Sequence, residues 1–172
     1  MRHEARGFTL IELMTAVMVA GVLLAIAIPS YREMTRNNRV SSATNDLVSA
    51  FATARSEALH QATPVSICAS TDGTSCSGST NWTAGWIVFL DPANAGVIDD
   101  ATNEIVQKWS VPSADTVLTG SVSYVRYATT GMLAGTAAQN IKIYTNACVG
   151  AKARQVDISV VGSLTTTTQN CP

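Results

Sequence analysis

The chain changes its pattern of apolar and polar residues twice along its length. Residues 8–28 form an apolar run of 21 residues in which Glu12 is the only charged side chain. At ~1.5 Å per residue, a helix of that length would reach about 31 Å, which is enough to span the hydrocarbon core of a bilayer. This run therefore predicts a membrane-length helix.

The second pattern covers residues 29–60, where apolar side chains recur mainly at intervals of three and four, as they do on one face of a helix. These positions are Tyr31, Met34, Val40, Ala43, Leu47, Phe51, Ala54 and Ala58. We expect one helix from about Thr9 to His60, kinked or loosened at Pro29 and ended by the Thr63–Pro64 step.

From Pro64 onward, short runs typical of β-strands alternate with turn residues. The expected strands are 65–69, 86–90, 104–109, 121–128, 140–144 and 155–161. Residues 86–90 include no polar position, which predicts a central strand covered on both faces, whereas Thr165–Thr168 is expected to be a loop. The fold class is therefore α+β: a long N-terminal helix whose amphipathic half packs on an antiparallel β-sheet or sandwich.

Glu12 needs a partner, because a carboxylate within hydrocarbon costs several kcal/mol by most estimates. A short charged leader, residues 2–6, precedes Gly7. Cleavage after Gly7 would leave a free α-amine on Phe8, about one helical turn from Glu12. We expect that amine to be the partner of the carboxylate.

The stretch from Gly7 to Leu13, GFTLIEL, resembles the processing signal of type IV prepilins and of the related pseudopilins of type II secretion. This resemblance implies that prepilin peptidase cleaves between Gly7 and Phe8 and that Phe8 is then N-methylated. It also implies that Glu12 neutralises the terminal amine of the neighbouring subunit as that subunit leaves the membrane. Such a pair attracts far more strongly in hydrocarbon than in water.

Two simpler interpretations of the apolar run were weighed against this one. A plain transmembrane anchor would explain the run but not Glu12. An ordinary secretory signal peptide would be cleaved after Ala27, where small residues follow the apolar core. A mass measurement separates the two processing schemes, because the mature chain starts either at methylated Phe8 or at unmodified Ile28.

Motifs in the second half of the chain narrow the resemblance to the GspH/FimT group of minor pseudopilins and minor pilins, closest to the FimU-like minor pilins. They are Gly85–Asp91 with Glu104–Val106, and the ending Val156–Ser159, Gly162 and Cys171–Pro172. The resemblance implies a pilin-like fold and a subunit that helps to initiate and assemble the type IV pilus near its tip, in support of motility or adhesion. Its partners would be other minor pilins and the major pilin. A minor, H-type pseudopilin of a type II secretion system is the alternative.

A DNA-binding competence pilin is a second alternative. Pilins of that kind carry a basic Gly-Arg-x-Arg segment before the last cysteine, whereas this chain has Gly162-Ser163-Leu164-Thr165. The net charge is −1 and there is no clustered surplus of basic residues of the kind that phosphate binding usually requires. We therefore expect no nucleic-acid partner.

The four cysteines all follow the apolar run, as disulfides in an oxidising compartment would require. Four cysteines allow three pairings, of which we favour Cys68 with Cys76 and Cys148 with Cys171. A zinc site is the rival, but the sequence has no C-x-x-C motif and only His60 could complete it. We expect no metal and no cofactor.

The chain is thus expected to comprise a cleaved leader (1–7), a transmembrane and filament-core helix (8–28), an amphipathic continuation (29–60) and a β-rich head domain (61–172). The head would be periplasmic while the apolar helix is in the inner membrane, and extracellular once the subunit enters the pilus. Because His60 is the only histidine left after processing, no Ser/His/Asp set is evident and we expect no enzymatic activity. Aromatic side chains should lie in the core, with Trp82 the expected exception.

Overall fold

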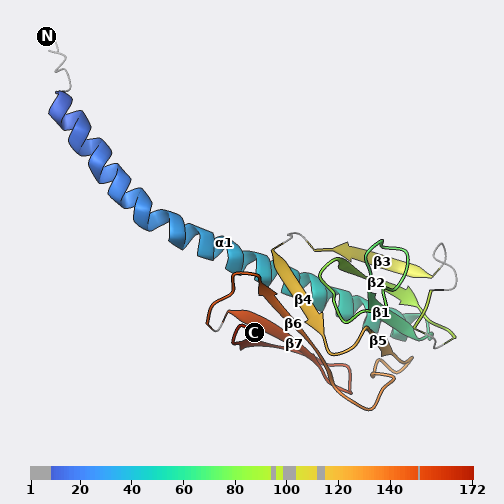
Figure 1. Ribbon diagram of the computed structural model, residues 1–172. Coiled ribbons are helices and arrows are strands. Elements are labelled where there is room, and N and C mark those ends of the chain that lie inside the picture. The colour runs from blue at the N-terminus through green and yellow to red at the C-terminus, as the bar shows by residue number, and fades with distance from the viewer. Residues whose placement is uncertain (1–8, 94–95, 99–103, 112–114, 151) are drawn as a thin grey trace, which may run out of the picture. The chain divides into compact units, whose positions relative to one another are not determined.

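The computed structural model describes residues 9–93, 96–98, 104–111, 115–150 and 152–172, which contain one helix and eight strands (Figure 1). In chain order these are α1 (Leu10–His60), β1 (Val65–Ala69), β2 (Gly85–Leu90), β3 (Ile105–Ser110), β4 (Thr116–Gly120), β5 (Tyr124–Tyr127), β6 (Gln139–Thr145), β7 (Ala153–Ile158) and β8 (Leu164–Gln169). The chain divides into two compact units, Met1–Asn37 and Asn38–Pro172, which we describe separately. We call the second unit the head.

The first unit contains the N-terminal part of α1. None of the described side chains from Thr9 to Asn37 is buried within the structure. The helix continues through Pro29, although proline has no N–H to donate to the preceding turn. The expectation of one helix from about Thr9 to His60 is confirmed.

The rest of α1 belongs to the head and supplies its central apolar stripe. The buried positions follow a spacing of mainly three and four residues: Val40, Ala43, Thr44, Leu47, Ala50, Phe51, Ala54 and Ala58. These side chains share one core cluster with inward-facing residues of both sheets, and Figure 1 shows this part of α1 running behind strands of both. Because half of the stripe is alanine, the strands can approach the helix backbone closely.

The head has two four-stranded antiparallel sheets, with strand orders β3-β2-β1-β5 and β4-β6-β7-β8. Strand β2 lies between β3 and β1, and its first five residues are buried. Trp86 and Val88 enter the main core, whereas Ile87 and Phe89 form a second cluster with Cys68 on the opposite face. The prediction of a central strand covered on both faces is confirmed.

The expected strand 121–128 is confirmed only in part, as β5, and sequence analysis missed β4. The structure has β4 in one sheet and β5 in the other, joined by a crossing at Ser121–Ser123. The backbone N–H of Ser121 donates to Asn140 in the second sheet, and Ser123 accepts from Ala69 in the first. The chain therefore changes sheets where the sequence showed only continuous β propensity.

The expected loop at Thr165–Thr168 is also wrong, because these residues form most of β8, which pairs with β7. The hairpin between the two strands turns at Gly162, which has a φ of +79°. A Cβ atom at this position would collide with the carbonyl oxygen of Gly131. Threonine favours strands because it is β-branched, but an exposed edge strand without a buried face lacks the alternation that reveals strands in a sequence.

Trp82 is buried rather than exposed, and its indole Nε1–H donates to the carbonyl oxygen of Val122 at 3.0 Å. The polar residues around it in the sequence suggested a surface loop. Its ring packs 6.4 Å from the ring of Phe51, so the loop is fastened to the helix by an aromatic contact.

We predict that Phe51→Ala lowers the free energy of unfolding of the head by about 3–5 kcal/mol, because the change removes a fully buried ring and leaves a cavity. Guanidinium unfolding of residues 38–172 measures the effect. Ser49→Ala, on the exposed side of the same helix, is the control and should stay within about 0.5 kcal/mol of the wild type. A Phe51→Ala head as stable as this control would contradict the assignment of the helix stripe to the core.

Candidate assembly site on the N-terminal helix and the polar network of the head

The helix begins with a cap that places Glu12 in its first turn. The backbone N–H of Glu12 donates to Oγ1 of Thr9 at 3.3 Å, and the N–H of Leu13 donates to the carbonyl oxygen of Thr9 at 3.2 Å. Thr9 is therefore the N-cap residue, and Glu12 stands at the third helical position. The negative charge also lies at the positive end of the helix dipole, where it is stabilised.

The carboxylate of Glu12 has no partner among the residues that the structure describes, and its side chain is exposed. Its neighbours Leu10, Ile11 and Leu13 are apolar and between 60% and 77% exposed. An 18-residue window of this helix has a mean hydropathy of 2.4, and none of it is buried. The segment is therefore long and apolar enough to cross a membrane.

Gly7 and Phe8, the expected cleavage and methylation site, lie outside the described residues. Their roles remain predictions. The structure shows only that the described helix begins two residues after Phe8, so a mature chain starting there would have its amine close to the helix N-terminus.

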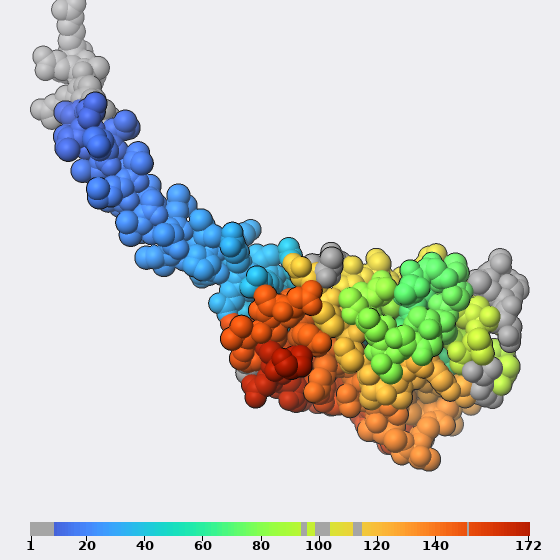
Figure 2. All heavy atoms as spheres, viewed as in Figure 1, coloured from blue at the N-terminus to red at the C-terminus, as the bar shows by residue number. Residues whose placement is uncertain are grey.

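Both favoured disulfides are present, Cys68 with Cys76 and Cys148 with Cys171, with Cα–Cα separations of 5.7 Å in each. The first ties β1 to the loop that follows it, which Figure 2 shows in green on the surface of the head. The second ties the chain after β6 to the segment after β8. All four thiols are therefore engaged, and no group of three or more potential metal ligands occurs in the described part of the chain.

Within the first disulfide loop, Asp72 organises a turn. Hydrogen bonds from the backbone N–H of Thr74 and from the hydroxyl and N–H of Ser75 hold the pKa of the Asp72 carboxyl well below its usual range. The Asp72 carboxylate is exposed, and it accepts hydrogen bonds from residues of its own loop. Its role is therefore structural.

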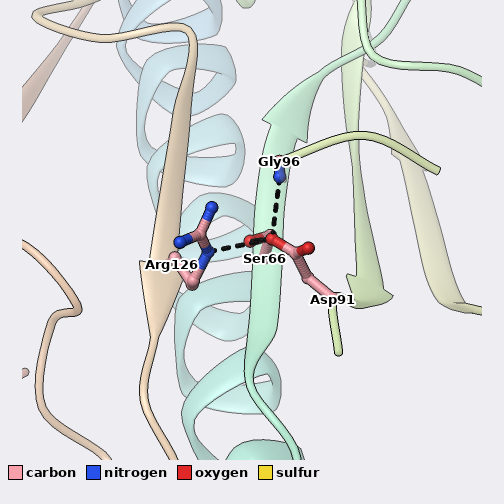
Figure 3. Close-up of polar contacts among 4 residues, drawn as sticks. All are labelled: Ser66, Asp91, Gly96 and Arg126. Carbon is pink, nitrogen blue, oxygen red and sulfur yellow. Dashed lines mark hydrogen bonds and ion pairs between the residues drawn. The ribbon is translucent and has the colours of Figure 1, made fainter. Parts of the chain in front are cut away.

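The head contains a buried polar network centred on Asp91, shown in Figure 3. Oδ2 of Asp91 accepts hydrogen bonds from the Ser66 hydroxyl at 2.7 Å, the Gly96 backbone N–H at 3.0 Å and Nε of Arg126 at 2.9 Å. The Asp91 side chain is 1% exposed and that of Arg126 is 14% exposed. One carboxylate thus joins β1, β5 and the chain that leaves β2.

Sequence reasoning had placed Asp91 in a strand-end motif without a partner. Arg126 lies 35 residues away and gave no signal of its own, because an isolated arginine in a strand pattern usually faces solvent. The only signal available was an acidic residue directly after a strand with no polar face.

A second polar contact fastens the helix to the β7–β8 turn. The Arg55 guanidinium donates to the carbonyl oxygens of Gly162 at 3.1 Å and Val161 at 3.2 Å. Nearby, burial raises the pKa of Tyr127 to about 12, although the positive charge of Arg55 acts in the opposite direction. These contacts stabilise the hairpin that sequence analysis had taken for a loop.

The basic side chains near the C-terminus do not form a separate cluster of free cations. Arg154 donates to Oγ1 of Thr168 on the neighbouring strand, and Lys152 also has an interaction partner. Arg154 and Lys152 thus each have a contact within the protein.

Comparisons with known proteins give a consistent result. Residues 43–162 match the family model described as type II transport protein GspH, and residues 2–28 match the prokaryotic N-terminal methylation motif. A fimbrial protein of Pseudomonas aeruginosa is 48% identical over 54 residues, which are 31% of this chain and 34% of that protein. The chain thus spans about a third of the length of such relatives.

In two further matches, the aligned region covers a larger share of the matched protein. The type IV narrow pilus major component PilA5 of Thermus thermophilus is 37% identical over 84 residues, 47% of this chain and 72% of that protein. The crystal structure of the type IV minor pilin FimU of Pseudomonas aeruginosa matches with a TM-score of 0.61 and 22% identity, over 81% of this chain and 92% of that one. At this identity the structural match shows a shared pilin-like fold.

We predict that Asp91→Asn destabilises the head by about 3–5 kcal/mol, because it leaves the largely buried Arg126 guanidinium without its counter-charge. The control is Asp115→Asn, which breaks the exposed pair with Arg39 (3.0 Å) and should cost less than about 1 kcal/mol. Urea unfolding of residues 38–172 compares them. An equal decrease in the free energy of unfolding in the two variants would contradict the claim that burial makes the Asp91–Arg126 pair more important for stability.

Proposed function

The chain belongs to the family described as type II transport protein GspH, and from that premise we propose that it is a minor type IV pilin that helps to prime and assemble the pilus near its tip. The N-terminal methylation motif and the pilus relatives support this proposal. The observation that carries it is Glu12, whose carboxylate lies in the first turn of an exposed apolar helix and has no partner among residues 9–93 or the other described ranges.

In the proposed mechanism, prepilin peptidase removes residues 1–7 and Phe8 becomes the methylated N-terminus. The apolar helix holds the subunit in the inner membrane, with the head in the periplasm. An oxidising compartment is also where the two disulfides of the head would form and persist.

Assembly then pairs charges that are costly to leave alone. The Glu12 carboxylate meets the α-amine of the neighbouring subunit. The free-energy cost of placing each charge in hydrocarbon is lower for the pair than for either charge alone. Because both charges sit within one helical turn of the chain start, the pair fixes the axial register between subunits. The exposed apolar side chains around Glu12 pack against helices of other subunits once lipid is left behind.

The partners of this subunit in the proposal are other minor pilins, which form the priming complex, and the major pilin, which would lie directly below. After assembly the head would be extracellular, where pilus-dependent motility or adhesion takes place. In this function the head binds no substrate and no cofactor, and the polar network around Asp91 stabilises the fold.

A second candidate is a minor, H-type pseudopilin of a type II secretion system. The observation that favours it is the description of the matching family, which names type II transport. The pairing chemistry at Glu12 would be the same in both assemblies, so the two candidates differ in partners and in cellular phenotype.

We predict that Glu12→Gln is cleaved and inserted normally but loses at least about tenfold in its ability to support pili, because the terminal amine of the neighbour stays unpaired. Intact mass gives the processing state, and pili sheared from cells give the assembly state. Glu12→Asp keeps the charge and should retain part of the activity.

Glu57→Gln is the matched control, since Glu57 lies on the same helix within the head and bonds only Gln61 in its own helix turn. It should support pili as the wild type does. Wild-type piliation by Glu12→Gln would contradict the charge-pair mechanism for this subunit.

A further inference from the structure

Strand β5 ends its sheet, and its outer edge is only partly covered. Val125 and Tyr127 pair with Ile67 and Val65 of β1, and the carbonyl oxygen of Ser123 accepts from Ala69. In an antiparallel ladder the backbone groups of alternate residues face the same neighbour. The N–H and C=O groups of the residues between them, Tyr124 and Arg126, therefore face away from β1.

One of these outward groups is satisfied within the head. The carbonyl oxygen of Arg126 accepts from the N–H of Ala134 at 2.9 Å. The N–H and C=O of Tyr124 and the N–H of Arg126 have no protein partner among the residues that the structure describes. A short stretch of sheet edge is thus left open.

This open edge forms one wall of a groove with a volume of about 390 Å³. The opposite wall comes from residues 133–139, and the lining includes Val122, Leu133 and Ala137. The Arg126–Ala134 hydrogen bond lies at one end of the open stretch, and the Ser121–Asn140 hydrogen bond (2.9 Å) lies at the other. The groove therefore has the length of a few extended residues.

Two of the other three sheet edges in the head carry protection that this one lacks. The outer edge of β4 is covered, because Trp82 donates to Leu118 and Gly120 donates to Thr80. The edge strand β3 has an irregular register and an exposed lysine, Lys108, which discourages pairing with another chain. The open stretch of β5 has neither a lysine nor a proline.

Arg126 indicates the chemistry of the segment that would bind there. Its Nε is held by Asp91, and its guanidinium lies 5.5 Å from the centre of the Tyr124 ring. Figure 3 shows its other two nitrogens pointing away from Asp91, and they have no hydrogen-bond partner in the described structure. A guanidinium fixed in this way is prepared to bind a carboxylate through its two free nitrogens.

We propose that the open edge of β5 binds an extended segment of a different pilin, rather than of a second copy of this chain, by strand addition, with a carboxylate of that segment on Arg126. Backbone pairing with Tyr124 and Arg126 would supply affinity, and the apolar groove and the guanidinium would supply specificity. That the partner is a pilin rests on the proposed function. The binding site is argued separately, from the open edge of β5, the groove beside it and the contacts of Arg126.

Peptide binding to the full chain in detergent micelles, followed by NMR, tests the site. The probe is acetyl-Thr-Val-Glu-Val-Thr-amide, and the matched probe has Gln in place of Glu. The expected result is that the amide resonances of Tyr124 and Arg126 shift and that the Glu peptide binds about fivefold more tightly, because its hydrogen bonds are charge-assisted.

Ala137→Asp places a negative charge on the exposed wall of the groove and should remove that preference for the Glu peptide. Gln107→Asp, exposed on β3, is the matched control and should leave it unchanged. Both substitutions are at exposed positions, so neither tests the buried ion pair of Arg126. Equal binding of the two peptides, or shifts confined to β3, would overturn the proposal. So would a shift of the same amides on raising the protein concentration alone, because the occupant would then be a second copy.

Complementation of a deletion strain separates this inference from the proposed function. If the deletion itself leaves pili intact, the priming role is wrong whatever the peptide does. If the deletion removes pili, Ala137→Asp should restore fewer of them than Gln107→Asp does. Equal restoration by the two variants would overturn the partner assignment alone.

Discussion

The Glu12 carboxylate is the constraint on which the rest of this protein depends. It lies in the first turn of an apolar helix, where Thr9 caps the backbone and no described side chain offers a counter-charge. In hydrocarbon such a group must find a cation or remain costly. In the proposed function, pairing with the amine of a neighbouring subunit supplies that cation.

The head solves a different problem, which is to pack its own part of α1, from Asn38 onward, against two sheets. Leu47 and Phe51 fill the core while alanines let the strands approach, and Arg55 fastens the β7–β8 turn to the same helix. On the far face of the first sheet, Asp91 connects three segments through one oxygen atom. The same contact that stabilises the head also orients Arg126 at the open edge of β5, which we infer to be functional.

The sequence predicted what depends on local pattern. The helix and the buried strand β2 stand out because their patterns are visible over a few residues. Glu12 stands out as a charge within an apolar run, and its role in assembly stays a prediction. Strand β8 did not stand out, since an exposed polar edge strand has no alternation, and Trp82 was misjudged because its burial depends on Phe51, far away in the chain. The Asp91–Arg126 pair could not be predicted at all, because only the fold brings the two side chains together.

The central claim is that this member of the GspH family primes type IV pili rather than serving type II secretion. A clean deletion, scored in one strain for surface pili and for enzymes exported to the medium, tests it most directly. The account predicts loss of pili with normal export, and recovery of the pili when the intact gene is returned. Normal pili with lost export would contradict it and would assign the subunit to the secretion pseudopilus.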